Sequence, residues 1–481
     1  LDFSACFSHR FEFRLTPHNI VGSRRAVTRC KIVTRYIDRH FINNSNTLMC
    51  TITNSKLPSR ILSHFYSTIR RPSIMVPFTC VALVSVFAAL FSTAHAIDVP
   101  GADNNHNYKV AVSHFPLTNT AFKDPYHPTE DRRVMASLFV PIPKDSCSSE
   151  CTNSYMPPMT AAIANEQFIA GGKRDIGVFE NMDYKVCCGS SGNIDASKIP
   201  VVVIDAQVDT SRLLYSTMAR YISANGVAVV LVDHPGDASI VQFTSSPTSS
   251  RIRRDTSDVY NSGTVALSNF SPLTAWNATI DKALSTRTTD IFFTLSQINT
   301  ADFLRRQFPS FKFSSGLNTN TFGIIGHGLG GTVATSLSLY NTSAISFSIN
   351  LSGTPPLANT TSIRNSPLWF FGRSDFRREN DINWATTWKH LTGRATEFDL
   401  VNSAIFDVSD LPVIVELARN EGGKPGTQGR GLSGNDAVQG QHAVTCFVEN
   451  IVKEVLGLDN QGVLLGDCIR MFGGVVPYPG V

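Results

Sequence analysis

The segment TFGIIGHGLGGTVATSLSLY (321–340) decides the fold. An apolar run leads into Gly326-His327-Gly328-Leu329-Gly330-Gly331, and apolar residues at helical spacing follow. Strand, tight glycine turn and helix in this order are typical of a nucleophile elbow, G-x-S-x-G, whose strained turn lifts a Ser hydroxyl above the sheet. Here the nucleophile position holds Gly328, which accepts the strained turn but has no hydroxyl.

The glycine spacing by itself leaves a second interpretation open, because a Gly-rich turn after a strand can also cradle phosphate. A dinucleotide site places its glycines in the first βα turn, with an acidic residue about 20 positions further on. The glycines of 326–331 come late in the expected sheet. The sequence therefore favours the elbow and predicts no nucleotide ligand.

Two further runs indicate buried parallel strands. These are KIPVVVID (198–205) and VAVVLVD (227–233), both continuous and rich in β-branched residues. The intervening SRLLYSTMARYISANG has apolar residues at helical spacing and stops at Asn225-Gly226. Alternating strands and helices predict a mostly parallel sheet flanked by helices, which is an α/β fold.

The same criteria extend the fold outward from these segments. Further strands are expected at 108–115, 133–140, 345–353 and 367–372, and helices at 276–307, 380–391, 409–419 and 438–456. Two insertions are expected, an irregular Cys-containing cap or lid at 147–192 and a Ser/Thr-rich excursion at 236–275. Residues 97–481 are therefore predicted to form a single domain without internal repeats.

Residues 1–74 differ in composition from the rest of the chain. They hold 12 of the 42 Lys and Arg residues but only 3 of the 38 Asp and Glu residues. They show no sustained hydrophobic period, so we interpret them as a disordered or artefactual leader. The remaining chain is mildly acidic, and it carries no basic patch that would indicate a nucleic-acid partner.

A targeting signal follows this leader. Residues 75–96 start at a Met after two arginines, contain the apolar run VALVSVFAALF, and end with Ala94-His95-Ala96. This pattern predicts a signal peptide cleaved after Ala96, and therefore secretion. An uncleaved anchor is the alternative, although the apolar run is shorter than the roughly 20 residues of a spanning helix.

The cysteines agree with export. Six follow Ala96: Cys147, Cys151, Cys187, Cys188, Cys446 and Cys468. An even number in an exported chain predicts disulfides, and six cysteines allow 15 connectivities. No His stands at ligand spacing beside them, so a zinc site is not indicated. Glycosylation sequons occur at Asn269, Asn277, Asn341, Asn350 and Asn359.

Several longer segments make the resemblance to a known family specific. They are RRVMASLFVP, YMPPMTAA, SRLLYSTMARYISANGVAVVLVDHPGD, GHGLGG, INLSGT and VSDLPVIVEL, and they span about 108–456. The chain resembles fungal secreted members of the platelet-activating factor acetylhydrolase family, which are 1-alkyl-2-acetylglycerophosphocholine esterases. The resemblance implies an α/β-hydrolase fold and a Ser–His–Asp triad that cleaves acyl chains from phospholipids without metal or other cofactor.

The positions that correspond to the family's Ser–His–Asp triad hold residues that cannot perform its chemistry. The nucleophile falls on Gly328, the acid on Ser352 in LSGT, and the base on Ile405 in SAIFDVSDLP. The oxyanion-hole positions fall on Gln207 and Val208, together with Leu329 after the elbow. No His occurs between 391 and 441 to replace the base.

Two hypotheses follow. In the first, the chain is a relative of these lipid-degrading esterases that has lost catalysis and at most binds a phospholipid, another small apolar ester or a partner. In the second, it is an active esterase that uses other residues. His327 and His234 are the nearest candidates, but both are interpreted as structural residues, and no alternative triad is evident.

Overall fold

A nine-stranded sheet forms the centre of the described part of the chain. Its order is β16-β15-β14-β13-β12-β7-β8-β3-β2. The strands are β2 (Tyr108–Lys123), β3 (Asp131–Pro143), β7 (Val201–Asp205), β8 (Ala228–Asp233), β12 (Phe322–His327), β13 (Ile345–Leu351), β14 (Leu368–Arg373), β15 (Ala395–Leu400) and β16 (Val475–Pro477). Neighbouring strands from β8 to β15 are parallel, whereas β2, β3 and β16 are added antiparallel at the two edges.

The computed structural model describes residues 97–102, 106–169, 177–243, 258–260, 278–340, 343–358, 366–420, 437–458 and 465–478. All of them belong to one compact unit, Phe91–Val481. The expected leader 1–74 and signal peptide 75–96 lie outside these residues. The same is true of four sequon asparagines: Asn269, Asn277, Asn341 and Asn359.

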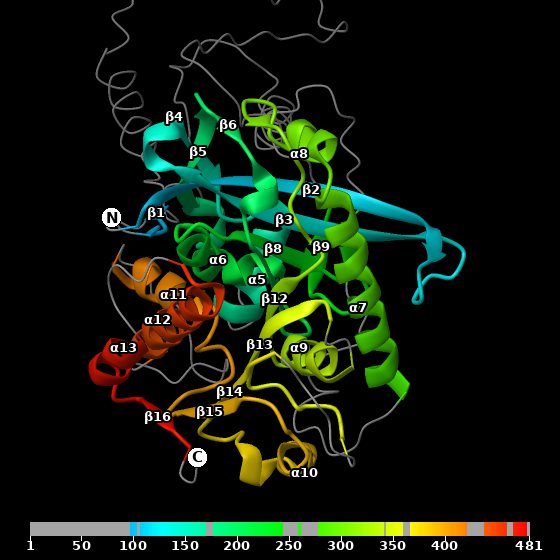
Figure 1. Ribbon diagram of the computed structural model, residues 1–481, viewed down its shortest axis with the longest axis vertical. Coiled ribbons are helices and arrows are strands. Elements are labelled where there is room, and N and C mark those ends of the chain that lie inside the picture. The colour runs from blue at the N-terminus through cyan, green and yellow to red at the C-terminus, as the bar shows by residue number, and fades with distance from the viewer. Residues whose placement is uncertain are drawn as a thin grey trace, which may run out of the picture. The chain divides into compact units, whose positions relative to one another are not determined.

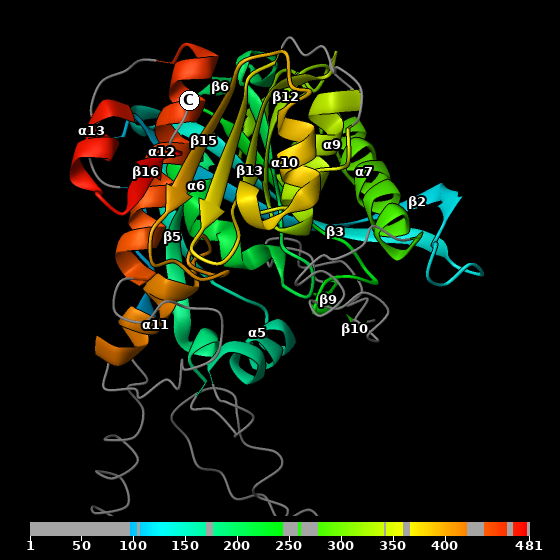
Figure 2. The same cartoon turned by 90° about the horizontal axis from the view of Figure 1, so that it is seen from below.

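Helices cover both faces of the sheet (Figures 1 and 2). One face carries α6 (Ser216–Ser223), α11 (Leu411–Asn420) and α12 (Ala437–Leu456), and the other carries α7 (Ala278–Ile298), α8 (Ala301–Gln307) and α9 (Leu329–Tyr340). Strand β7 shows why both faces need cover. Val202 and Ile204 pack toward α6, and Val201 and Val203 pack toward α9, as expected from side chains that alternate along a strand.

The predicted α/β-hydrolase architecture is confirmed, with differences in detail. The segment 276–307, expected to be one helix, is two, because Thr300 accepts a hydrogen bond from the Phe303 backbone N–H and starts a new helix. Strands β15 and β16 were not expected, since ATEFDL mixes charge into a buried strand and β16 has only 3 residues. Two short helices were also missed: α5 (Pro158–Ala164) and α13 (Leu465–Met471).

The segment 147–192 was wrongly expected to be irregular. It contains β4 (Cys147–Ser154) and β5 (Met182–Ser190), which pair antiparallel beside β1 (Ile97–Asp98). The β4 sequence, CSSECTNS, shows no alternation of apolar and polar residues, and no residue of β4 is buried. Of the second insertion, β9 (Ile240–Gln242) pairs with β10 (Asp258–Tyr260), while 244–257 and 261–275 lie outside the described residues.

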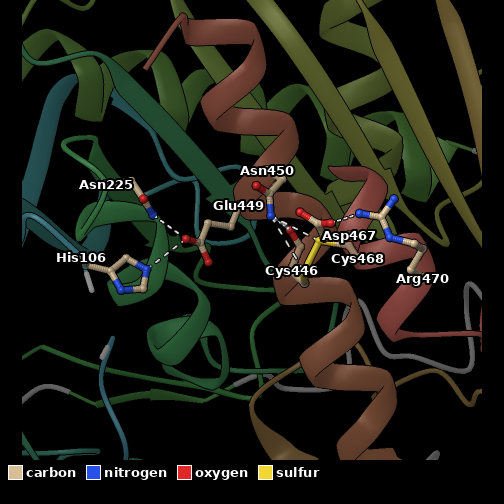
Figure 3. The surroundings of a disulfide bond; sticks show 8 residues. All are labelled: His106, Asn225, Cys446, Glu449, Asn450, Asp467, Cys468 and Arg470. Carbon is tan, nitrogen blue, oxygen red and sulfur yellow. Dashed lines mark hydrogen bonds and ion pairs between the residues drawn. A yellow bond between two sulfur atoms is a disulfide. The ribbon is translucent and has the colours of Figure 1, made fainter. Parts of the chain in front are cut away.

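Three disulfides confirm the prediction drawn from the even number of cysteines. Cys147–Cys187 and Cys151–Cys188 join β4 to β5, and Cys446–Cys468 joins α12 to α13. Figure 3 shows the third of these bonds between the two helices. Among the described helices, none has an apolar stretch long enough to cross a bilayer.

Candidate active site

The elbow lies between two neighbouring strands of the sheet. Strand β12 ends at His327 and α9 begins at Leu329, so that Gly328 alone forms the turn, with φ of +53°. A side chain on Gly326 would lie 1.9 Å from the carbonyl oxygen of Gly330, so strand and helix approach too closely for one. The backbone therefore has the left-handed turn and close packing that an elbow requires.

The side chain of Gln207 occupies the space above this turn. Its Oε1 accepts hydrogen bonds from the backbone N–H groups of Val208, at 2.8 Å, and Leu329, at 2.9 Å. These N–H groups belong to two of the three positions predicted for the oxyanion hole, and the third position is Gln207 itself. A Cβ placed on Gly328 would lie only 2.2 Å from the Gln207 amide. A neutral amide oxygen of the chain itself thus accepts from both N–H groups at the positions expected for the hole.

The loop that carries Gln207 is held from several sides. Strand β7 brings it beside the elbow, since Asp205 pairs with Gly326. Arg287 on α7 donates from Nη1 to the Ala206 carbonyl at 2.6 Å, and the Gln207 N–H donates to the Tyr215 hydroxyl at 3.2 Å. Gln207 is only 4% exposed, so its amide is fixed rather than free to rotate in solvent.

A buried charge network lies beneath this loop. His234 contacts Asp205 through Nε2 at 3.0 Å and Asp290 through Nδ1 at 2.9 Å. Burial opposes a charge on the ring, but the two carboxylates outweigh it and raise the pKa of His234 to about 9. Arg287 forms an ion pair with Asp205, and Arg132 forms one with Asp290. The prediction that His234 is structural agrees with these contacts, because it serves as a charged bridge within the scaffold.

The position expected for the acid is Ser352, which directly follows β13. Its backbone has φ of +56°, and its hydroxyl donates to the Phe371 carbonyl at 3.0 Å. The side chain is 5% exposed. A hydroxyl used in this way does not supply the negative charge that would orient a catalytic imidazole and stabilise its protonated form.

The position expected for the base is Ile405, in the loop between β15 and α11. Ile405 is partly buried and packs against the core on the α6 face. Its neighbour Phe406 meets the ring of His327 edge-on, with centroids 6.1 Å apart. An apolar side chain therefore stands where a proton acceptor is required.

His327, beside the elbow, does not replace the missing base. Its Nδ1 lies 2.7 Å from the Tyr215 hydroxyl, which is already bonded to the Gln207 N–H. Burial, and then the positive charge of Arg373, lower the pKa of His327 to about 3. An imidazole with this pKa is a poor proton acceptor at neutral pH.

The structure also contains a Ser–His pair that the sequence did not indicate. Ser137 Oγ lies 2.7 Å from His114 Nδ1, across the pairing of β2 with β3. The serine is fully buried and also accepts a hydrogen bond from Arg212 Nε at 2.8 Å. Burial and the Arg212 charge lower the pKa of His114 to about 3. An arginine thus stands beside a pair that would need a carboxylate, and the arrangement is structural.

Part of the first insertion covers the candidate site. Gln167 donates from Nε2 to the Asp209 carbonyl at 2.6 Å, next to the loop that holds Gln207. Phe168 packs edge-on against Phe406, with centroids 5.1 Å apart. The elbow, the oxyanion loop and the Ile405 loop therefore meet at the carboxyl ends of the strands, as expected for this fold, but beneath protein rather than beside an open hydroxyl.

The structure brings together Gly328, Leu329, Val208 and Gln207 and assigns the amide of Gln207 a role that spacing did not reveal. The sequence placed Gln207 at one of the oxyanion-hole positions but did not indicate that its side chain would accept hydrogen bonds from the other two. In the described residues, no three His, Cys, Asp or Glu side chains converge as a metal site would require.

Comparisons with known proteins agree with the geometry. Residues 176–415 match the profile of the family described as "Platelet-activating factor acetylhydrolase, isoform II". A "Probable 1-alkyl-2-acetylglycerophosphocholine esterase" of Arthroderma benhamiae is 27% identical over 355 residues, which cover 69% of this chain and 82% of the relative.

The fold has a counterpart among solved structures. A ferulic acid esterase from Streptomyces cinnamoneus superposes with a TM-score of 0.57 at 18% sequence identity. The match covers 79% of this chain and 99% of the esterase chain. At this identity the likeness supports the shared fold.

Proposed function

We propose that this chain, which belongs to the platelet-activating factor acetylhydrolase family, keeps the esterase scaffold of that family but does not hydrolyse esters. Acyl transfer needs a nucleophile, a base that accepts its proton and donors that stabilise the oxyanion. Gly328, Ile405 and Ser352 supply no nucleophile, base or acid at the corresponding positions. Each of these losses removes a large share of the rate enhancement, because triad members act as a unit.

The observation that carries the proposal is the contact of Gln207 Oε1 with the two N–H groups of the hole. A substrate carbonyl would have to displace an amide oxygen that already satisfies both donors. Displacement would also require the buried Gln207 side chain to leave, since its amide lies where a group attached at Gly328 would stand. The missing nucleophile and the Gln207 contact therefore support the same conclusion.

The ligand class proposed for this scaffold is a phospholipid or another small apolar ester, or a protein partner, bound without cleavage. Family membership supports the lipid, because the curated relative is named as an esterase of a glycerophosphocholine. A titration with 1-alkyl-2-acetylglycerophosphocholine below its micellar range tests this part. Saturable binding without acetate release supports it, and the absence of binding leaves the fold with a purely structural role.

Secretion is the proposed location. Three disulfides support it, because such bonds persist in oxidising compartments. Sequencing the amino terminus of protein recovered from the culture medium tests it. A terminus at Ile97 is expected, and retention of the chain inside the cell would contradict secretion.

A serine-directed fluorophosphonate tests the catalytic part of the proposal. These reagents label serines whose hydroxyl is activated by a base and faces an oxyanion hole. No labelling of the purified protein is expected. Labelling mapped by mass spectrometry to one serine would show an active site elsewhere and would overturn the proposal.

A further inference from the structure

A cavity of about 630 Å³ lies between α6 and α12, away from the elbow. On the α6 side it is lined by Thr217 and Tyr221, which are four residues apart and share one face of the helix, and by Asn225, which lies in the turn after the helix end. On the α12 side, the eight positions from Gln441 to Glu449 span about 12 Å at 1.5 Å per residue. The cavity is thus an elongated groove of the size that small ligands occupy in proteins.

The opposite wall repeats the pattern on α12. Gln441, Thr445 and Glu449 follow one another at the same four-residue spacing and line the groove. Gln441 is 1% exposed and Thr445 is 6% exposed, and the Gln441 amide donates to the Thr445 hydroxyl at 3.1 Å. Each wall thus carries hydroxyl and carboxamide groups held by helix packing.

Glu449 lines the groove and contacts His106 and Asn225 (Figure 3). Its Oε1 accepts from His106 Nε2 at 3.0 Å and from Asn225 Nδ2 at 2.8 Å. Both contacts of this carboxylate in the described residues use the same oxygen, so Oε2 keeps its capacity to accept a hydrogen bond. The side chains of His106 and Glu449 are 13% and 14% exposed, which leaves the pair accessible from the groove.

The apolar side of the groove is held by the third disulfide. Cys446 lines the groove and bonds to Cys468 on α13, and Asn450 Nδ2 lies 3.2 Å from the Cys468 sulfur. Phe472, directly after α13, and Tyr221 add aromatic rings to the lining. The groove is therefore a feature of crosslinked helices and does not depend on a loop.

We infer that this groove binds a small polyhydroxylated ligand, such as a short saccharide. Hydroxyl and carboxamide groups both donate and accept hydrogen bonds, as sugar hydroxyls do, and the Glu449 oxygen accepts strongly. Tyrosine and phenylalanine rings offer apolar faces to the less polar face of a sugar ring. This inference is independent of whether the elbow is catalytic.

Other ligand classes fit the lining less well. A lipid acyl chain would cover Glu449 Oε2 without offering it a hydrogen-bond donor. A multiply charged anion would meet Glu449, and a simple cation would meet Lys453, since both side chains line the groove. A neutral ligand with many hydrogen-bonding groups is compatible with both charges.

A glycan array of mono- to tetrasaccharides, probed with the full chain, tests the inference. At least one saccharide should be retained and should bind saturably in isothermal titration, raising Tm by about 2 °C at ten times its Kd. Glu449→Gln should weaken binding about tenfold or more, because a charge-assisted hydrogen bond is lost. Thr445→Trp should abolish binding by filling the groove.

A matched control lies on the same helix. Glu454 pairs with Arg394 at an exposed position, and Glu454→Gln should leave saccharide affinity unchanged. If Thr445→Trp fails to fold, the saccharide affinity of Glu449→Gln still tests the inference, because glutamine has nearly the same side-chain volume as glutamate. Retention of no glycan, or equal binding by Glu449→Gln, overturns the inference. Stabilisation by citrate or by lysophosphatidylcholine, but by no glycan, would assign the groove to another class and would also overturn it.

Discussion

The side-chain oxygen of Gln207 lies 2.9 Å from the backbone nitrogen of Leu329, the residue that follows the elbow. The contact joins the end of β7 to the start of α9 across the point where substrate would enter. In the proposed account, the Gln207 amide oxygen permanently occupies the place that a reaction's oxyanion would occupy only transiently. The two substitutions at the site are therefore sterically linked, because an amide in the hole requires a residue without a side chain at Gly328.

This link predicts coupling between two substitutions. Gly328→Ser alone should destabilise the protein by about 2–4 kcal/mol, since the new Cβ overlaps the Gln207 amide and the turn has positive φ. In the double variant with Gln207→Gly, the clash disappears. Denaturant unfolding should give a favourable coupling energy of about 1 kcal/mol or more.

Gly473→Ser is the control for the double-mutant cycle of Gly328→Ser and Gln207→Gly. No atom lies within 4 Å of a Cβ at Gly473, so this substitution should change stability by less than about 0.5 kcal/mol and show no coupling to Gln207→Gly. Additive effects of Gly328→Ser and Gln207→Gly would mean that the amide does not occupy the elbow.

The two hydrogen bonds that Gln207 accepts also predict that replacing this residue lowers the free energy of unfolding. Gln207→Leu should lower the free energy of unfolding by about 2 kcal/mol, because the N–H groups of Val208 and Leu329 lose their acceptor in a buried site. Gln297→Leu serves as the matched substitution, since the Gln297 amide donates to the Ser296 hydroxyl in a solvent-exposed hydrogen bond. Equal stability of the two variants would contradict the role assigned to Gln207.

The scaffold charge network predicts a pH dependence of stability. The folded pKa of His234, about 9, exceeds its usual value of 6.5. Its contribution is therefore full below about pH 6.5 and is lost as the pH rises through about 9. A shift of this size is worth on the order of 3 kcal/mol.

Thermal unfolding of His234→Gln isolates that contribution. The fall in Tm between pH 6.5 and pH 9.5 should be smaller in His234→Gln than in the unmodified chain. Parallel curves for the two proteins would show that the ring is not charged between Asp205 and Asp290.

Much of the fold follows from the sequence because its signals are local. Strands β7, β8 and β12 are continuous β-branched or apolar runs, and Gly226 ends the α6 segment with φ of +95°. The strand pair β4–β5 was not predicted, because β4 has no buried residue and no apolar alternation, although β5 buries Met182, Tyr184 and Val186. β15 was missed because Glu397 and Asp399 are buried within it, against the usual polarity of a core strand.

For the candidate site, too, the sequence located some positions but could not indicate contacts between residues far apart in the chain. The resemblance placed the triad positions on Gly328 and Ser352, which follow strands that the sequence predicted, and on Ile405, which it identified from the segment SAIFDVSDLP. It could not indicate that Gln207 would turn into the hole, since that contact joins residues 122 positions apart. Likewise, the pairing of Ser137 with His114 depends on the register of β2 against β3.

The third disulfide supports a further prediction. Removing it with Cys446→Ala and Cys468→Ala together should cost about 3 kcal/mol of stability, as expected for a crosslink that closes a loop of this length. Cys446→Ala alone should cost about as much, because either change removes the same bond. Unchanged denaturant midpoints under non-reducing conditions would mean that the bond does not form.

The most direct test of the central claim is acetate release from 1-alkyl-2-acetylglycerophosphocholine by the purified protein. A glycine at the elbow and an amide in the oxyanion hole predict a rate equal to that of buffer alone at every pH from 6 to 9. Saturable release that a fluorophosphonate abolishes would contradict the account.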